Sequence, residues 1–510
     1  MLAKVMGSAL VGLDAYAVEV EVDVGGGLPQ FSVVGLPDAT VRESRDRVRA
    51  ALKNSGFAFP VKKVTVNLAP ADLKKEGSGL DLPMAVGILV AEGLLPPEAV
   101  QGRVLAGELS LDGRIKPVTG GLSIGLAFRR EAELLLPPES AREAAMVEGC
   151  RVAPVRTLPE VVEYLSGRVQ IEALAVDRSA LLADVRPDVD DYADVQGQDH
   201  AKRGLEVAAA GGHNVVMVGP PGAGKTMLAQ RLPGILPPMA GEEMLETTRV
   251  HSIAGLLPAD RPVVSVRPFR APHHSVSDAG LIGGGTVPRP GEVSLAHNGV
   301  LFLDEMPLFR GSALDGLRQP MEEGRVTVTR VSGSLRYPAR VMLVGAMNPC
   351  PCGYYGDALR ECRCTPRQVR AYRTRLSGPL MDRLDIQLMV PAVPVMELGR
   401  GKAGESSATI RARVAEARAR QTVRYRDERI FCNAQLRPKL LKKYCRLDDA
   451  GQALLEQALT GLGLSARAYA RILRVARTIA DLAGSEGIDA VHLAEAIQYR
   501  SLDRRQALAA

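Results

Sequence analysis

Hydrophobic and polar positions alternate along the first part of the chain as they do in β-strands. Residues 15–23 (AYAVEVEVD), 30–36 (QFSVVGL) and 61–70 (VKKVTVNLAP) place an apolar side chain at nearly every second position. Each segment therefore predicts a strand with one buried face.

Helical segments separate these strands. Residues 41–56 predict a helix that ends at Gly56, and the apolar run over residues 81–95 predicts a buried helix. Residues 103–115 predict a hairpin that turns at Asp112 and Gly113. Residues 1–166 are thus expected to form one α/β domain.

The pattern changes three times in the rest of the chain. Residues 167–190 are polar and mixed, which indicates a linker, and residues 191–395 contain short apolar strands that predict a second α/β domain. Residues 391–406 predict a hinge, and from there the pattern is helical to residue 510. A chain of 510 residues is too long for one core, so several domains are expected.

One segment carries a specific signal for phosphate binding. The apolar strand Val215 to Val218 leads into Gly219-Pro220-Pro221-Gly222-Ala223-Gly224-Lys225-Thr226, which matches G-x-x-x-x-G-K-[ST]. A strand, a glycine-rich loop and a helix N-terminus together present backbone N–H groups to phosphate oxygens. Lys225 is expected to reach the β- and γ-phosphates of ATP, and Thr226 to hold Mg²⁺.

Polar side chains follow two further apolar strands. Asp304 and Glu305 end the run Gly299 to Leu303, where Asp304 would hold Mg²⁺ and Glu305 would orient or deprotonate the attacking water. Asn348 follows the next strand and either contacts the γ-phosphate or forms an ordinary turn before Pro349.

Arg383 is the candidate for a charge-stabilising arginine supplied to a neighbouring subunit. A surface ion pair with Asp382 or Asp385 is the alternative for this side chain.

Composition restricts the classes of function. The net charge of +6 permits nucleic-acid binding without requiring it, and the absence of Trp argues against an aromatic base-stacking platform. The most apolar stretch is too short and too charged to span a membrane, and the start of the chain lacks a signal peptide. We therefore expect a cytoplasmic protein with no membrane partner.

Four of the seven cysteines lie close together in the sequence. Cys350, Cys352, Cys362 and Cys364 form two C-x-C pairs, which can meet in a tetrahedral S₄ site that suits structural Zn²⁺. Four reduced free thiols are the alternative. Metal binding by His273 and His274 is not expected.

Several long motifs resemble the AAA+ superfamily, and within it the magnesium-chelatase-like ATPases of the ComM/YifB family. They include RPFRAPHHSVSDAGLIGGG, GAMNPCPCGYYGD, LSGPLMDRLDIQL and SARAYARILRVARTIADL. The resemblance implies Walker A at Gly219 to Thr226, Walker B at Asp304 and Glu305, sensor 1 at Asn348 and an arginine finger acting in trans at Arg383. It also implies a C-terminal helical lid carrying sensor 2 at Arg467, and a homo-hexameric ring.

The N-terminal region resembles the Lon-protease-like α/β fold of the S5 type. The matching segments are residues 74–93 and 105–121. The family's serine nucleophile aligns with Asp81 and its lysine with Ser123, while Ser78 lies three residues early without an identified base. We therefore expect no peptidase activity, and a scaffold or nucleic-acid-binding role instead.

A hairpin is predicted over residues 324–337, with its turn at Ser332 and Gly333. In related ring motors such as the MCM helicases, a hairpin before sensor 1 lines the pore, so Arg330 and Arg336 are the candidate DNA contacts. A solvated basic face is the alternative.

The resemblance implies a ring-forming, ATP-driven DNA helicase that promotes branch migration in recombination and natural transformation. Its partners would be single-stranded or branched DNA and a recombinase. A magnesium-chelatase-type motor and a protein-remodelling ATPase are the alternatives.

Overall fold

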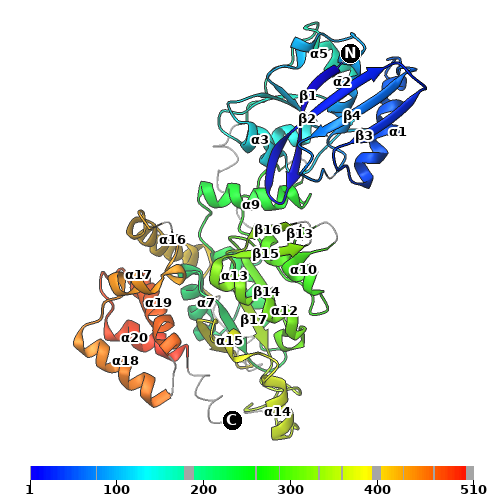
Figure 1. Cartoon of the computed structure of the whole chain (residues 1–510). Coiled ribbons are helices and arrows are strands. Elements are labelled where there is room, and N and C mark those ends of the chain that lie inside the picture. The colour runs from blue at the N-terminus through cyan, green and yellow to red at the C-terminus, as the bar shows by residue number, and fades with distance from the viewer. Residues whose placement is uncertain are drawn as a thin grey trace. The chain divides into compact units, whose positions relative to one another are not determined.

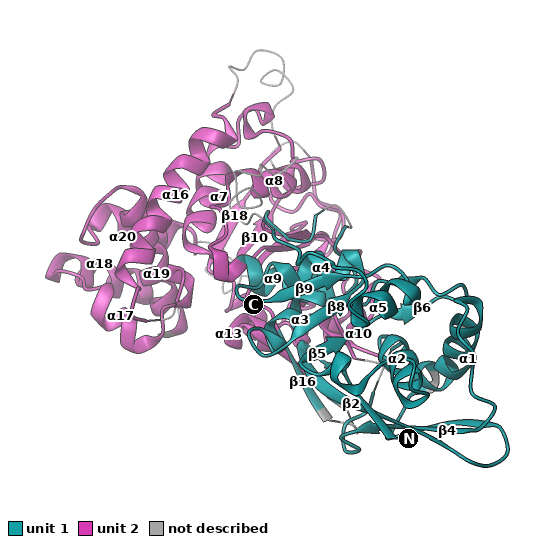
Figure 2. Ribbon diagram, turned by 90° about the horizontal axis from the view of Figure 1, so that it is seen from above, with its two compact units in different colours: residues 1–183, 244–265, 329–337 teal, residues 184–243, 266–328, 338–510 magenta. Residues whose placement is uncertain are grey.

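The computed structural model of the chain is shown in Figure 1. It describes residues 2–75, 77–176, 189–258, 261–285, 288–330, 333–357, 360–392, 404–428, 430–462 and 466–500. Half of the linker (177–188), most of the hinge (393–403) and Ser332 of the predicted turn lie outside these ranges. The chain forms two compact units, coloured in Figure 2, each with its own core.

Unit 1 comprises residues 1–183, 244–265 and 329–337. Its seven-stranded sheet has the order β3-β4-β2-β1-β5-β8-β9. The strands are β1 (Leu2–Val11), β2 (Asp14–Gly25), β3 (Gln30–Val34), β4 (Lys63–Ala69), β5 (Arg103–Leu105), β8 (Glu133–Leu136) and β9 (Arg151–Pro154). The helices of the N-terminal region are α1 (Ala39–Asn54), α2 (Asp81–Ala91), α3 (Gly121–Phe128), α4 (Pro138–Ala145) and α5 (Leu158–Leu165).

The predicted elements of the N-terminal region are present. Every residue of α2 is buried, as its apolar run predicts. The prediction over residues 103–115 needs one correction, because β5 joins the main sheet between β1 and β8. The hairpin itself is the short pair β6 (Glu108–Leu109) and β7 (Ile115–Lys116). Its short strands leave β5 free to pair elsewhere.

Unit 2 comprises residues 184–243, 266–328 and 338–510. Its five-stranded sheet is parallel, with the order β11-β14-β17-β10-β18. The strands are β10 (Val215–Val218), β11 (Phe269–Arg270), β14 (Val300–Leu303), β17 (Met342–Met347) and β18 (Ile386–Met389). β10, β14 and β17 are wholly buried, which explains their unbroken apolar runs.

Helices precede and connect these strands along the chain. They are α7 (Asp199–Gly211), α8 (Lys225–Arg231), α9 (Gly241–Ile253), α10 (Asp278–Ile282), α11 (Glu292–Leu295), α12 (Gly311–Gly316), α13 (Arg318–Glu323), α14 (Pro366–Arg373) and α15 (Gly378–Met381). Two smaller pairs of strands are β12 (Gly283–Gly284) with β13 (Arg289–Pro290) and β15 (Arg325–Arg330) with β16 (Gly333–Pro338). The second pair is the predicted hairpin. Residues 329–337 of this hairpin belong to unit 1. Residues 244–265, which comprise most of α9 and the segment that follows α9, belong to unit 1 as well.

The described chain after β18 is helical, as the sequence predicts. It contains α16 (Ser407–Arg424), α17 (Pro438–Tyr444), α18 (Asp449–Leu462), α19 (Ala466–Leu482) and α20 (Ala490–Gln498). These helices gather into one body, in which α16 and α19 contact α7 (Figure 1). The mixed α/β fold with a C-terminal helical region is therefore confirmed. In the described part of the chain, no helix has the length and apolar character to cross a membrane.

Candidate ATP site

The phosphate loop joins β10 to α8, as its motif predicts. Gly222 and Gly224 have φ angles of +76° and +85°, a backbone conformation that strongly favours glycine. Lys225 Nζ donates to the carbonyl oxygens of Gly219 at 2.7 Å and Pro220 at 2.8 Å. Burial lowers the pKa of Lys225, while Asp304 and Glu305 act in the opposite direction. The ammonium group is therefore held inside the loop that would receive phosphate.

Strands β14 and β17 bring the predicted polar groups to the same edge of the sheet. Thr226 Oγ1 donates to Asp304 Oδ2 at 2.7 Å, so a hydroxyl and a carboxylate suited to Mg²⁺ meet across the loop. Lys225 Nζ also donates to Asn348 Oδ1 at 3.2 Å. Carboxyl ends of parallel strands share one edge, which explains why segments distant in sequence converge here.

Glu305 adopts a left-handed backbone conformation, with φ +48°. This is uncommon outside glycine and occurs where the surrounding structure enforces it. Its side chain is about half exposed, and its Oε2 lies 3.8 Å from His274 Nδ1. This proximity was not predicted, because His274 is distant from Glu305 in the sequence and no local motif signals their contact.

Arg383 lies at the other end of the strands of this sheet, where β10 begins. Its carbonyl oxygen accepts from Asn214 Nδ2 at 3.3 Å, and Asn214 precedes the strand whose far end carries the phosphate loop. Four strand residues span about 13 Å. The guanidinium pairs with Glu322 and donates to the carbonyl of Pro379. The ion pair considered from the sequence therefore needs a correction, because Arg383 pairs with Glu322 and not with Asp382 or Asp385.

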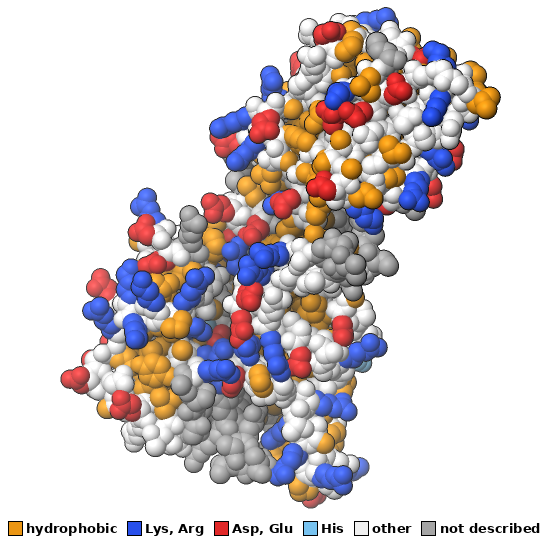
Figure 3. Space-filling view, in the orientation of Figure 1, with side chains coloured by type: hydrophobic (Ala, Val, Ile, Leu, Met, Phe, Trp, Pro, Cys, Tyr) orange, Lys and Arg blue, Asp and Glu red, His pale blue; other side chains and the backbone are white. Residues whose placement is uncertain are grey.

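Arg467 lies beside Arg383 rather than beside the phosphate loop. Its Nη1 is 3.5 Å from Asp382 Oδ2, and its side chain is largely exposed. Burial, followed by the charges of Arg467, Arg471 and Arg318, lowers the pKa of Arg383. Both arginines line one open hollow of about 580 Å³ at this edge of unit 2. Figure 3 shows Lys and Arg side chains gathered over the region of α13, α15 and α19.

The neighbouring arginines of α19 have structural partners. Arg471 Nη1 donates to Asp385 Oδ1 at 2.6 Å, and Arg474 Nε donates to the carbonyl of Leu436 at 2.9 Å. Arg477 is buried against Asp481. Burial acts to raise the pKa of Asp385, but the positive charge of Arg471 and the hydrogen bond from His213 outweigh burial. The pKa of Asp385 therefore lies below its ordinary value. Arg471 and Arg477 thus face acidic partners within the chain.

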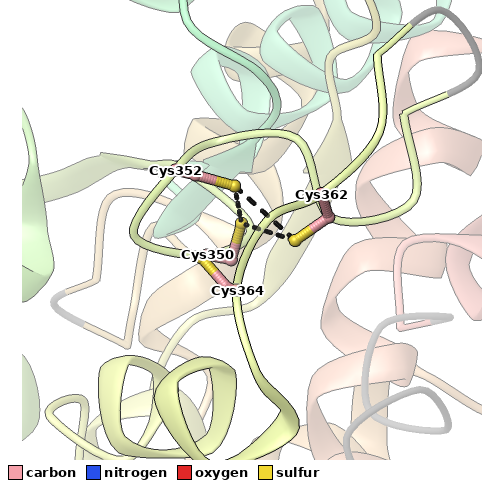
Figure 4. Close-up of side chains that lie close together, drawn as sticks. All are labelled: Cys350, Cys352, Cys362 and Cys364. Carbon is pink, nitrogen blue, oxygen red and sulfur yellow. Dashed lines mark hydrogen bonds between the residues drawn. The ribbon is translucent and has the colours of Figure 1, made fainter.

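The four clustered cysteines meet in space, as Figure 4 shows. Cys350 Sγ lies 3.4 Å from Cys352 Sγ and 3.7 Å from Cys362 Sγ, and the latter two sulfurs are 3.6 Å apart. All four sulfurs, including that of Cys364, lie within 4.8 Å of one another. These separations exclude disulfides, whose sulfurs are about 2.05 Å apart. They form a possible metal site.

In unit 1, the residues at the peptidase positions are engaged in structural contacts. Asp81 begins α2, is fully buried, and accepts hydrogen bonds from Ser44 and from Arg47 Nε. Burial raises its pKa despite these donors. Ser123 Oγ donates to the carbonyl of Leu13 at 2.7 Å.

Ser123 also contacts the helix that follows the phosphate-binding region. Arg249 of α9 donates to Ser123 Oγ at 3.1 Å and to the carbonyl of Leu13 at 3.0 Å. Its guanidinium also pairs with Asp14 at 2.5 Å. The position that aligns with a catalytic lysine is thus a docking point for Arg249 within unit 1. The sequence did not reveal this pairing.

Ser78 has an acidic partner that is distant in the sequence. Its hydroxyl donates to Glu108, which also accepts from Lys116 Nζ at 3.4 Å. Burial would raise the pKa of Glu108, but Ser78 and Lys116 lower it overall. A carboxylate with a lowered pKa is a poor general base.

The predicted DNA-contacting arginines lie on the hairpin. Arg336 is exposed on β16, whereas Arg330 ends β15 and its side chain lies outside the described residues.

Comparison with known proteins agrees with this arrangement. Residues 191–398 match the family of magnesium chelatase subunit ChlI, residues 20–140 match the family described as subunit ChlI of Mg-chelatase, and residues 404–500 match its C-terminal family. An uncharacterized protein YifB of Salmonella typhimurium is 45% identical over 508 residues, which cover 99% of this chain and 98% of that protein.

Two further relatives bear on function. Competence protein ComM of Haemophilus influenzae is 44% identical over 506 residues, covering 99% of this chain and 98% of that protein. The magnesium-chelatase 67 kDa subunit of Chlorobaculum parvum is 32% identical over 162 residues, covering 31% of this chain and 23% of that protein. The chain therefore belongs to the magnesium-chelatase-like AAA+ ATPases of the ComM/YifB family.

Proposed function

We propose that this ATPase is a ring-forming DNA motor that promotes branch migration during homologous recombination and natural transformation. The observation that carries the proposal is the similarity to a competence protein over nearly the full length of the chain. The chain also has the Lys225–Asn348 and Thr226–Asp304 contacts that an ATP site requires. Single-stranded or branched DNA is its proposed substrate, and a recombinase is a proposed partner. Cytoplasmic location remains part of this proposal.

The position of Arg383 supports ring formation. Its backbone lies one strand length from the phosphate loop of its own chain, and its guanidinium is bonded to Glu322 and Pro379. An arginine at that edge can serve an ATP site on another subunit more readily than its own. Arg467 shares the hollow, so we propose that both arginines complete a neighbour's site in a homo-hexamer.

ATP and Mg²⁺ are the group and ion that the family implies for this site. Thr226 and Asp304 would hold Mg²⁺, which supplies charge neutralisation to the phosphates. Lys225 and Asn348 would orient the γ-phosphate, and Glu305 would accept a proton from the attacking water. The Thr226–Asp304 and Lys225–Asn348 contacts fit this assignment.

Zinc is the metal that we propose for the cysteine loop. A tetrahedral ZnS₄ centre with bonds of about 2.3 Å has sulfur–sulfur edges of about 3.8 Å. The measured separations of 3.4–3.7 Å are close to these edges. Four thiolates fill the coordination shell, which assigns the ion a structural role.

Arg336 supports DNA contact by the hairpin. It is exposed on β16, and a positive side chain repeated around a ring would create a basic channel for phosphates. For the N-terminal region we propose a scaffold or nucleic-acid-binding role without peptidase activity. The burial of Asp81 and the docking of Arg249 on Ser123 support that view.

A magnesium-chelatase-type motor is the second candidate function. The likeness to the 67 kDa chelatase subunit favours it, but this likeness covers only 31% of the chain. A branch-migration assay separates the candidates. The purified protein with ATP should extend the heteroduplex of a three-strand junction, whereas Glu305→Gln should not. Failure of the active ATPase to move any junction would contradict the proposed DNA function.

A further inference from the structure

We propose that the four-cysteine loop is a metal-dependent clamp on the phosphate loop, so that zinc occupancy sets the affinity for ATP. This inference rests on the proposed zinc site and adds a regulatory role to it. The clamp comprises residues 350–357 and 360–364, which contain the four cysteines and Gly353. Two contacts connect it to the ATP site, and a third closes the cysteine loop on itself.

The first contact is through the chain itself. Asn348 accepts a hydrogen bond from Lys225 Nζ at 3.2 Å, and the first metal-ligand candidate, Cys350, is only two residues further on. Cys350 is fully buried. A metal bound to its sulfur would fix the backbone beside Asn348, and thereby the amide that faces the lysine.

The second contact joins the cysteine loop directly to the phosphate loop. Gly353 follows Cys352, has φ +88°, and packs so closely on Pro221 that a Cβ there would lie 2.4 Å from Pro221 Cδ. Real Cβ atoms essentially never approach a neighbour so closely. Pro221 belongs to Walker A, so the backbone of one loop forms a wall for the other.

The third contact closes the cysteine loop on itself. Cys364 directly precedes Thr365, the N-cap of α14, whose capping box with Gln368 fixes the start of the helix. At the end of α14, Arg373 Nε donates to the carbonyl of Pro349 at 3.1 Å. The last ligand and the first ligand are therefore tied to the same short region behind Asn348.

Metal binding would join these contacts into one rigid element. Each thiol that becomes a ligand releases its proton and forms a metal–sulfur bond. Without the ion, four adjacent sulfurs have no covalent link, and the wall formed by Gly353 loses its support. A phosphate loop that must be ordered by the nucleotide binds it more weakly than one already ordered.

The test measures metal content and nucleotide binding separately from hydrolysis. Full-length protein is analysed for bound zinc, then stripped with a chelator selective for zinc over magnesium and returned to Mg²⁺. Affinity for a fluorescent ATP analogue is measured before stripping, after stripping and after zinc is added back. We expect one zinc per chain, at least a tenfold loss of affinity on stripping, and recovery on zinc addition.

Cobalt provides a spectroscopic readout that does not require activity. Co²⁺ added to stripped protein should give the intense thiolate-to-cobalt absorption of a tetrahedral S₄ site. Cys352→Ser should reduce cobalt and zinc binding and lower ATP affinity. Cys150→Ser is the matched control, because Cys150 is a free cysteine of unit 1 outside the cluster. It should change neither metal content nor affinity.

Gly353→Ala tests the clamp without altering a thiol. We expect this variant to retain zinc but to bind the ATP analogue at least fivefold more weakly. Pro221→Ala in the same background should recover part of the loss by removing the opposing ring atoms. Circular dichroism verifies that each variant is folded, and reversible stripping of the unmodified protein remains informative if a variant is not.

Unchanged affinity after zinc removal would overturn the clamp while leaving a structural zinc site. Failure to bind zinc or cobalt in the reduced protein would overturn both the site and the clamp. Neither result depends on DNA, whereas loss of DNA-stimulated hydrolysis with intact zinc-dependent ATP binding would contradict only the proposed motor.

Discussion

Lys225 Nζ lies 3.2 Å from Asn348 Oδ1, which joins the phosphate-loop lysine to the amide at the end of the neighbouring strand. β10 and β17 pair in parallel, so this contact follows from the register of two buried strands. The amide can therefore act on the same phosphate as the lysine.

Asn348→Ala should lower kcat by about 10²-fold, the scale for removing one positioned polar group in an active site. ATP affinity should change far less, because Lys225 and the loop amides remain. Steady-state kinetics together with analogue binding measure the two effects. A loss confined to ATP affinity would show that Asn348 binds the ground state only.

Glu305→Gln should abolish turnover while preserving ATP binding, because glutamine retains the shape of the side chain but cannot accept the proton of water. Lys225→Ala should abolish turnover through loss of phosphate contact. Rapid-quench measurement of phosphate release checks both variants. Hydrolysis at the unmodified rate in either folded variant would contradict the ATP-site assignment.

His274→Ala should change kcat with little change in KM for ATP, because His274 faces Glu305 and is not part of the phosphate loop. Ser275→Ala is a suitable control, since Ser275 contacts His273 rather than Glu305. Equal effects of the two substitutions would indicate that the segment has only a structural role.

Arg383→Ala should reduce turnover by about 10³-fold or more, as expected for a charge-stabilising arginine. Mixing it with Lys225→Ala should restore activity, because each variant supplies the group that the other lacks. Arg437→Ala, an exposed arginine that lines the same hollow, should have little effect. Absence of rescue in demonstrably mixed oligomers would place the function of Arg383 within its own subunit.

The Asp385–Arg471 pair should stabilise unit 2 across neutral pH. The folded-state pKa of Asp385 is lowered, so its contribution is complete above the ordinary aspartate pKa of about 3.9 and is lost only as pH falls below it. Asp385→Asn leaves Arg471 without its carboxylate and should cost about 3–5 kcal/mol. Thermal unfolding at pH 7 and pH 3 measures both effects. An equal cost at both pH values would contradict a charge-based contribution.

The sequence predicted features that depend on local periodicity or a contiguous motif. Alternation located β2, β3 and β4, and the Gly219 to Thr226 motif identified the strand–loop–helix unit. Their determinants lie within a few residues of one another. The spacing of the cysteines likewise indicated a common site, which the structure brings together.

Contacts between segments that are distant in the sequence could not be predicted from it. Arg249 meets Ser123, His274 faces Glu305, and Gly353 packs on Pro221 through the tertiary arrangement of separate elements. Periodicity carries no information about which side chain fills the space beside another element.

The measurement that decides the proposed motor function is steady-state ATP hydrolysis with no DNA and with single-stranded, duplex or forked DNA, at low and moderate salt. Arg336→Ala provides the control for contact by the hairpin. We predict stimulation by single-stranded or forked DNA that weakens with salt, because counterions compete for phosphate contacts. A hydrolysis rate that is the same with every DNA at both salt concentrations would contradict a DNA motor.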